Sequence, residues 1–139
     1  MRRPLVQASA ATISRALEWT EAFFARVEDE LSRFRSTSAL SRLNQAAGRG
    51  PQVVSPLLWT VVMSALQAAD DSGGIYDPTL LHTLERIGYD RSFEAIHGHG
   101  TAEPIATDVP SFGSWRRVRL DRARCSVSLP ADLALDFGG

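Results

Sequence analysis

The chain has 139 residues, of which 44% are hydrophobic and 22% are charged, and its formal net charge at pH 7 is −1. This composition is typical of a globular domain and argues against a disordered, fibrous or membrane-spanning chain. The near-neutral charge gives no reason to expect nucleic acid or an anionic membrane as a partner. All fifteen basic residues are arginine, which excludes chemistry that depends on a lysine side chain.

The beginning of the sequence does not resemble a secretory signal. The segment from Leu5 to Ser14 is interrupted by polar residues and contains no continuous apolar run. The single cysteine, Cys125, provides neither a disulfide framework nor a cysteine metal site, and we expect it to be a small buried hydrophobe. No lipidated cysteine is recognisable either, so the sequence favours a cytoplasmic protein.

A long amphipathic helix is predicted between Ala8 and Phe34. Apolar residues recur there at spacings of three, four or seven, which places them on one stripe of a helix. The stripe contains Ile13, Leu17, Phe24, Val27, Leu31 and Phe34, and Trp19 and Phe23 widen it. The acidic residues lie mostly off this stripe, as expected for a solvated face.

Two further helices have recognisable start signals. Ser55 followed by Pro56 is a typical helix cap, and this second helix should end where Gly73 follows Ser72. Asp77, which precedes a proline, predicts the cap of a third, short helix.

Strands are expected towards the end of the sequence. Residues 92–114 are rich in glycine, proline and histidine and predict a long irregular connection. Apolar and polar residues then alternate between 117 and 129, which predicts a hairpin that turns at 121–124, and residues 133–137 predict one more strand. The expected fold is therefore α+β, with helices packed on an antiparallel sheet.

Four segments give a more specific indication than periodicity does. They are FRSTSALSRLN at 34–44, VSPL at 54–57, SGGIYDPT at 72–79 and LALDFGG at 133–139. In this order and spacing they resemble the ApbE family of FAD:protein FMN transferases. The resemblance extends over residues 13–139 and implies that residues 1–139 are the N-terminal portion of a single domain, truncated at the DFGG turn.

The resemblance implies a magnesium-dependent transfer of FMN from FAD to a threonine hydroxyl of a target flavoprotein. Transfer of this kind depends on positioning and on a metal that neutralises developing charge. The lysine and the later acidic and hydroxyl residues that the family uses for magnesium and transfer have no counterpart before Gly139. We therefore expect FAD and Mg²⁺ as ligands, no catalytic residue in this chain, and impaired or absent catalysis by the chain alone.

Two candidate flavin contacts lie in the first of these segments, and the flavin-nucleotide site is expected at the loops after the first and second helices. The resemblance places the ring of Phe34 against the isoalloxazine, and packing in the core is the alternative. It gives Asn44 a hydrogen bond to the ligand, because an amide can donate and accept at once. The alternative for Asn44 is a helix-ending residue satisfied by nearby backbone.

The later segments supply the remaining candidates. The resemblance places Ile75, Tyr76 and Asp77 at the FAD, although a helix cap also explains Asp77. Asp136 is expected to contact the flavin nucleotide beside glycines that allow close approach, and a solvent-facing aspartate on an edge strand is the alternative. Gly139 is expected to offer a main-chain oxygen to magnesium.

Other functions are also open. The chain could be a non-catalytic flavin-binding module, or a self-associating one, because exposed sheet edges and an apolar terminus favour a homo-oligomer. An RNA- or phosphate-binding hairpin would use Arg116, Arg117, Arg119, Arg122 and Arg124. No aromatic residues alternate with these arginines, so a solvated strand face is preferred. His97 and His99 lack a neighbouring carboxylate or cysteine, so a metal site is not expected there.

Overall fold

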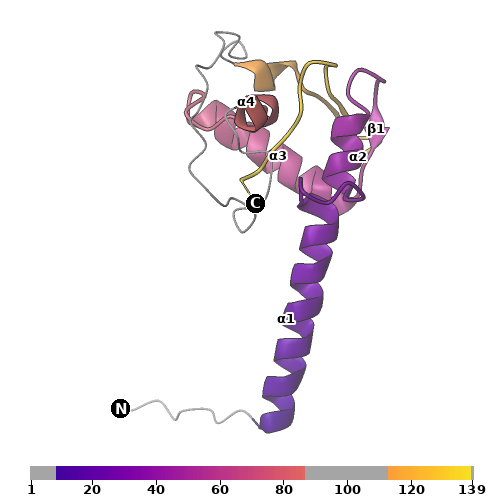
Figure 1. The fold of residues 1–139 in the computed structure, drawn as a ribbon, viewed down its shortest axis with the longest axis vertical. Helices are drawn as coiled ribbons and strands as arrows, with labels where there is room; N and C mark the ends of the chain where they lie inside the picture. Colours follow the sequence, from indigo (N-terminus) through magenta and orange to yellow (C-terminus); the bar gives the residue numbers. More distant parts are fainter. Residues whose placement is uncertain (1–8, 87–112, 139) are drawn as a thin grey trace.

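The computed structural model describes residues 9–86 and 113–138. His97, His99 and Gly139 lie outside these residues, as does nearly all of the long connection expected at 92–114. The described elements, in chain order, are α1 (Ala10–Leu31), α2 (Ala39–Gln45), β1 (Gln52–Val53), α3 (Pro56–Asp71), α4 (Leu81–Arg86), the 3-10 helix η2 (Ser114–Arg117), β2 (Arg119–Asp121) and β3 (Ser126–Ser128). Figure 1 shows helices beside a small sheet, which confirms the α+β fold class.

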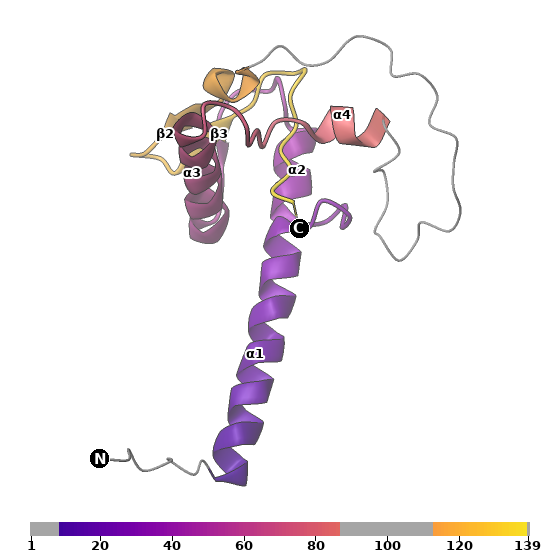
Figure 2. The ribbon, with the colours of Figure 1, turned by 90° about the vertical axis from the view of Figure 1, so that its left-hand side faces the viewer.

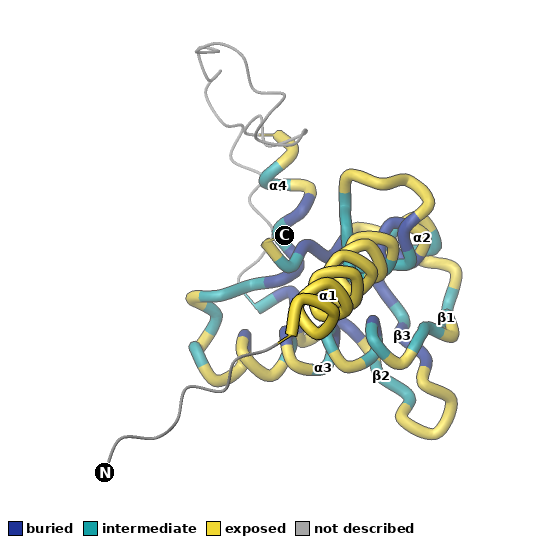
Figure 3. Tube along the Cα trace, turned by 90° about the horizontal axis from the view of Figure 1, so that it is seen from below, coloured by how far each residue is buried: buried dark blue, intermediate teal, exposed yellow. Residues whose placement is uncertain are grey.

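Helix α1 extends away from the rest of the described chain like a rod (Figures 1 and 2). Its N-terminus is capped by Ser9, whose hydroxyl accepts a hydrogen bond from the Thr12 amide. Of the described residues, none in α1 is buried, and Figure 3 shows most of the helix as exposed. The predicted helix is confirmed, but only the end of its apolar stripe, at Leu31, packs against the core.

Helix α3 follows its sequence signals closely. Ser55 caps it by accepting a hydrogen bond from the Leu58 amide, and Pro56 occupies the first turn. Its apolar face is buried at Leu58, Val62, Ala65 and Ala69. The helix ends before Gly73 and Gly74, which both have positive φ angles and so allow the chain to turn sharply.

The strands form one antiparallel sheet in the order β1-β3-β2. Val127 lies opposite Gln52 on one side and Leu120 on the other. The predicted hairpin is confirmed, and the Asp121 carboxylate orders its turn by accepting hydrogen bonds from the amides of Ala123 and Arg124. The expected burial of Cys125 is wrong, because this residue is exposed at the turn, with a φ angle of 47°.

Two sequence expectations about local structure are wrong. The third helix begins at Leu81 rather than after Asp77, because the Asp77 carboxylate closes a turn onto Thr79 instead of capping a helix. The last segment, residues 133–138, was expected to contain a strand. In the described chain it makes only an isolated parallel bridge between Ala134 and Leu80, and no regular strand. All residues of Leu133–Asp136 are buried, so the segment crosses the interior instead of presenting one face to solvent.

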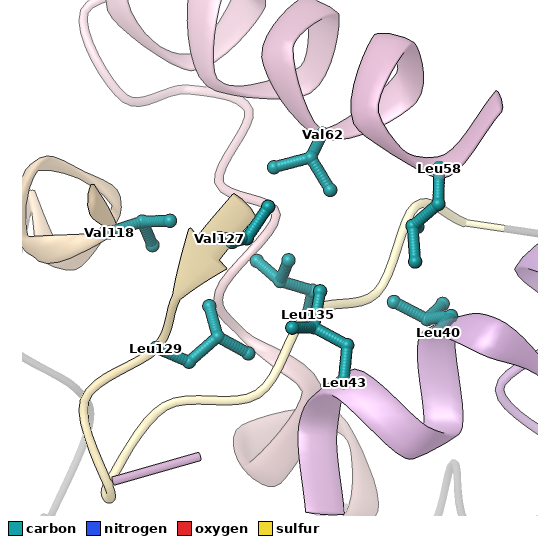
Figure 4. Packing of buried hydrophobic residues seen from close by; sticks show 8 residues of the cluster. All are labelled: Leu40, Leu43, Leu58, Val62, Val118, Val127, Leu129 and Leu135. Carbon is teal, nitrogen blue, oxygen red and sulfur yellow. The ribbon is translucent and has the colours of Figure 1, made fainter. Parts of the chain in front are cut away.

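The core lies between α2, α3, β3 and the last segment (Figure 4). Its buried cluster consists of Leu40, Leu43, Leu58, Val62, Val118, Val127, Leu129 and Leu135. Leu135 is completely buried among these side chains. This packing holds the last segment beside α2 and α3. It therefore also fixes the position of the candidate site residue Asp136, which comes directly after Leu135.

In the part of the chain that the structure describes, no helix is both long enough and apolar enough to cross a bilayer.

Candidate functional site

Asn44 fastens the last segment to α2. Its Nδ2 donates to the main-chain oxygen of Leu135 at 2.9 Å, and the Leu135 amide donates to its Oδ1 at 2.8 Å. The side chain thus pairs with a peptide group 91 residues away, much as a neighbouring strand would. The backbone partner is therefore distant in sequence rather than nearby. An amide can make two further hydrogen bonds, so a ligand contact by Asn44 stays a prediction.

A buried ion pair joins the end of α1 to the same segment. Arg33 Nε lies 3.3 Å from Asp136 Oδ2, and each side chain is only 8% exposed. The other carboxylate oxygen of Asp136 accepts from the Gly138 amide at 3.1 Å, and the Asp136 amide donates to the oxygen of Pro78 at 2.9 Å. The solvent-facing alternative for Asp136 is therefore wrong. This residue connects three segments that are far apart in sequence.

Phe34 lies at the surface beside this ion pair. Phe34 is 46% exposed, and the Arg33 guanidinium lies 4.3 Å from the centre of its ring. The structure does not place Phe34 in the core, so the core-packing alternative is wrong. The cation–π contact holds the ring next to the buried pair, and the ring offers a flat apolar surface to a ligand.

The turn between α3 and α4 presents Ile75 outwards. The Ile75 side chain is 94% exposed, whereas the Tyr76 amide is tied to the Ser72 hydroxyl at 3.1 Å. Asp77 Oδ1 accepts from the amide of Thr79 at 2.8 Å and from its hydroxyl at 2.6 Å. The turn is therefore internally ordered, and its most apolar residue is available for contact.

Tyr76 is partly buried in the turn between α3 and α4. Burial raises the pKa of its phenol, and the negative charges of Asp136 and Asp77 raise it further. The hydroxyl therefore stays neutral at physiological pH and can donate a hydrogen bond. Tyr76 also lines one depression together with Phe137, so the turn and the last segment lie close together there.

A shallow depression of about 390 Å³ adjoins the site on α3. Tyr76 and Phe137 contribute aromatic rings to it. The other lining residues, small or apolar ones on α3, are Thr60, Val61, Ser64, Ala65 and Ala68. A largely apolar surface with a few polar groups is typical of a site for an aromatic ligand.

The described residues do not by themselves fit a magnesium ion. No group of three or more histidine, cysteine, aspartate or glutamate side chains gathers among them, whereas magnesium prefers about six oxygen ligands. Asp77 and Asp136 already accept hydrogen bonds or pair with Arg33. The candidate metal ligand Gly139 lies outside the described residues.

Two arginines next to the hairpin form ion pairs within the chain. Arg117 pairs with Asp132 through two hydrogen bonds of 2.7 Å, and Arg116 pairs with Asp70 at 3.1 Å. Both arginines are about half exposed. Their charges are thus balanced locally, which agrees with the preferred interpretation of a solvated face.

Arg33 is the site residue that sequence reasoning missed. A buried arginine nearly always has a charged partner, but no local pattern indicates that this partner is Asp136. The only sequence signal was the position of Arg33 directly before Phe34. The pairing becomes visible only when the fold brings the end of α1 to the last segment.

Comparison with known proteins identifies the class to which this fold and site belong. The profile of the ApbE family matches residues 5–139, and the chain belongs to that family. Over 132 residues it is 39% identical to an FAD:protein FMN transferase of Treponema pallidum (strain Nichols), an alignment that covers 94% of this chain and 34% of the relative.

Solved structures share the fold. The apo form of Pseudomonas stutzeri flavinyl transferase ApbE superposes with a TM-score of 0.72 at 19% identity, covering 97% of this chain and 41% of that one. The flavin transferase ApbE of Vibrio cholerae gives a TM-score of 0.67 at 20% identity, covering 96% and 41%. The chain thus spans about a third of the curated relative and about two fifths of these structures.

Proposed function

We propose that this chain forms the FAD-binding part of an FAD:protein FMN transferase. The observation that carries the proposal is the meeting of three family-like segments at one place. Asn44 of the first segment binds Leu135 of the last, and Asp136 of the last binds the main chain of Pro78 in the turn between them. The resemblance assigned flavin contacts to these same segments.

In the proposed reaction, the pyrophosphate of FAD is cleaved and AMP leaves. A new phosphoester bond forms between the FMN phosphorus and a threonine hydroxyl of the target flavoprotein, and the hydroxyl loses its proton. Because phosphoryl transfer depends mainly on positioning, we assign the described residues to binding. Phe34 contacts the flavin ring, Ile75 makes apolar contact, and the neutral hydroxyl of Tyr76 donates a hydrogen bond. None of them is proposed as a catalytic residue.

The charges of the site favour a cation as a cofactor. Arg33 balances Asp136, whereas Asp77 adds a negative charge beside a ligand that carries two phosphates. We propose that magnesium offsets this repulsion in the active transferase and that the main-chain oxygen of Gly139 is one of its ligands. When bound, magnesium would neutralise the negative charge that develops on the phosphate during transfer.

The first test is an FAD titration of the purified chain, with and without magnesium, followed by flavin fluorescence. We expect saturable binding that is stronger with magnesium and at least about tenfold weaker in Asn44→Ala and in Asp77→Ala. Gln45→Ala is the matched control, because Gln45 is the exposed neighbour of Asn44. No binding at millimolar FAD, or equal binding by all four chains, contradicts the proposal.

A second test separates transfer from flavin binding alone. The chain is incubated with FAD, magnesium and the flavoprotein that the Treponema relative modifies, and covalent flavin is detected by fluorescence in a denaturing gel. A signal that disappears when the acceptor threonine is replaced by alanine supports transfer. Because we expect impaired or absent catalysis by this chain alone, binding of FAD with little or no covalent product is the expected result, and efficient transfer would overturn that expectation.

A further inference from the structure

Arg33 contacts two candidate flavin-binding residues that lie far apart in the sequence. Its Nε pairs with Asp136 Oδ2 at 3.3 Å, at a place where both side chains are almost fully buried. Its guanidinium carbon lies over the ring of Phe34, 4.3 Å from the ring centre. One planar group therefore connects the last segment of the chain to one face of the Phe34 ring.

The main chain of Arg33 is also held in place. The Ser41 hydroxyl on α2 lies 3.4 Å from the main-chain oxygens of both Ser32 and Arg33, and it can donate to either. Ser41 is itself buried. Arg33 is thus fixed at its main chain by α2 and at its side chain by Asp136, whereas the neighbouring Phe34 is partly exposed.

We propose that Arg33 is a positioning residue for flavin binding, which holds the Phe34 ring in the orientation that receives the isoalloxazine. The inference rests on the proposed function, in which Phe34 contacts the flavin ring. Because the guanidinium occupies one face of the phenyl ring, the isoalloxazine stacks on the opposite face. Arg33 therefore acts through Phe34 and does not touch the FAD.

The planar shape of arginine suits it to this double contact. A guanidinium can hydrogen-bond a carboxylate at its edge while its flat face lies on an aromatic ring. A lysine ammonium is a compact charge on a flexible stem, so it can pair with Asp136 but does not cover the Phe34 ring in one fixed orientation. A ring that turns freely has to be ordered when the flavin binds, and this ordering lowers the affinity.

The test is a double-mutant cycle on FAD binding by the full chain, measured by isothermal titration calorimetry. Arg33→Lys is chosen because it keeps a positive charge beside Asp136, and we expect it to weaken FAD binding about two- to tenfold. Phe34→Leu removes the stacking surface and should weaken binding at least about fivefold. The control is Arg35→Lys, which changes an exposed arginine and should alter the affinity less than about twofold.

The decisive chain carries both changes. If Arg33 acts through Phe34, then Arg33→Lys should alter FAD affinity less than about twofold in the Phe34→Leu background. A purely structural role would give the same loss in both backgrounds, and that result overturns the inference. Visible circular dichroism of the flavin at saturating FAD is a second measurement, independent of affinity. Its bands should change in Arg33→Lys but not in Arg35→Lys, and unchanged bands in Arg33→Lys contradict the inference.

Failure of the proposed function gives a different result. If the wild-type chain binds no FAD, the flavin site itself is absent and the inference falls with it. If the wild type and Arg33→Lys bind FAD equally well, the site stands and only the role of Arg33 is overturned. Urea unfolding accompanies each titration. An Arg33→Lys chain that is unfolded at the temperature of the titration also overturns the inference, because Arg33 would then serve folding.

Discussion

Helices α1 and α3 have similar sequence signals and different surroundings. Each begins after a serine cap, and each has an apolar stripe at helical spacing. Helix α3 buries that stripe in the core, whereas no described residue of α1 is buried. The spacing of apolar residues thus determines that a helix forms and which side is apolar. What covers that side is determined by other parts of the fold.

The contrast also exists within α1 and the residues that follow it. The end of the helix is fixed through Leu31 in the core and through the buried ion pair of Arg33 with Asp136. Its first half projects from the rest of the described chain (Figures 1 and 2). Substitutions at the fixed end should therefore change folding stability strongly, and substitutions in the projecting half should change it little.

The largest expected effect is that of Arg33→Met. This change leaves the Asp136 carboxylate buried without its partner, which typically costs about 3–5 kcal/mol. Arg35→Met is the control, because Arg35 makes exposed ion pairs with Glu28 and Asp29 that contribute about 0–1 kcal/mol. Urea unfolding followed by circular dichroism measures both. Similar losses for the two variants would show that the buried pair does not fix the end of α1.

Leu58→Ala should be nearly as destabilising. Leu58 is fully buried on α3, and removing such a side chain costs about 2–5 kcal/mol through lost burial and a cavity. Leu17→Ala on α1 should cost less than about 0.5 kcal/mol when the chain is dilute and monomeric, because Leu17 is 60% exposed. Equal costs would mean that α1 is covered within a single chain, and would remove the contrast between the helices.

Asn44→Ala should have an intermediate effect on stability. It removes both hydrogen bonds to Leu135 and leaves that part-buried peptide group unpaired, at a cost of about 1–3 kcal/mol. Gln45→Ala should be neutral within about 0.5 kcal/mol because Gln45 is exposed. Hydrogen exchange of the Leu135 amide is the most local measurement. An unchanged exchange rate in Asn44→Ala would contradict this role.

The smallest effect concerns an exposed ion pair. Hydrogen bonding to Arg117 lowers the pKa of Asp132 below its usual value of 3.8. A carboxyl group whose pKa is lowered by folding contributes stability above its unfolded-state pKa and loses it as the pH falls through the folded-state pKa. Asp132→Asn should therefore be slightly less stable than the wild type at pH 7 and equal to it well below pH 3.8, as measured by thermal unfolding. A difference that persists in strong acid would contradict the pairing.

Local features were predictable from the sequence because their causes are local. A serine cap acts within one turn, which is why α3 begins where expected. The hairpin was predictable because alternating residues report a strand face directly. The resemblance to the ApbE family came from short motifs whose spacing along the chain is visible in the sequence.

The remaining features depend on contacts between distant residues. The sequence predicted that Asp77 caps a helix, but its carboxylate accepts hydrogen bonds from the amide and the hydroxyl of Thr79. The alternation of apolar and polar residues at 133–137 suggested a strand with one exposed face. In the structure, consecutive residues of this segment are buried, whichever way they point. Neither the pairing of Arg33 with Asp136 nor that of Asn44 with Leu135 has a local signature, because each joins segments that meet only after folding.

The most direct test of the account is hydrogen exchange of the purified chain with and without FAD and magnesium. The account predicts that FAD slows exchange in three segments together, 34–44, 72–79 and 133–138, because these segments form one site. Projecting residues 10–26 of α1 should show no change. Protection confined to one segment, or protection outside all three, would contradict the claim that they form a common flavin-nucleotide site.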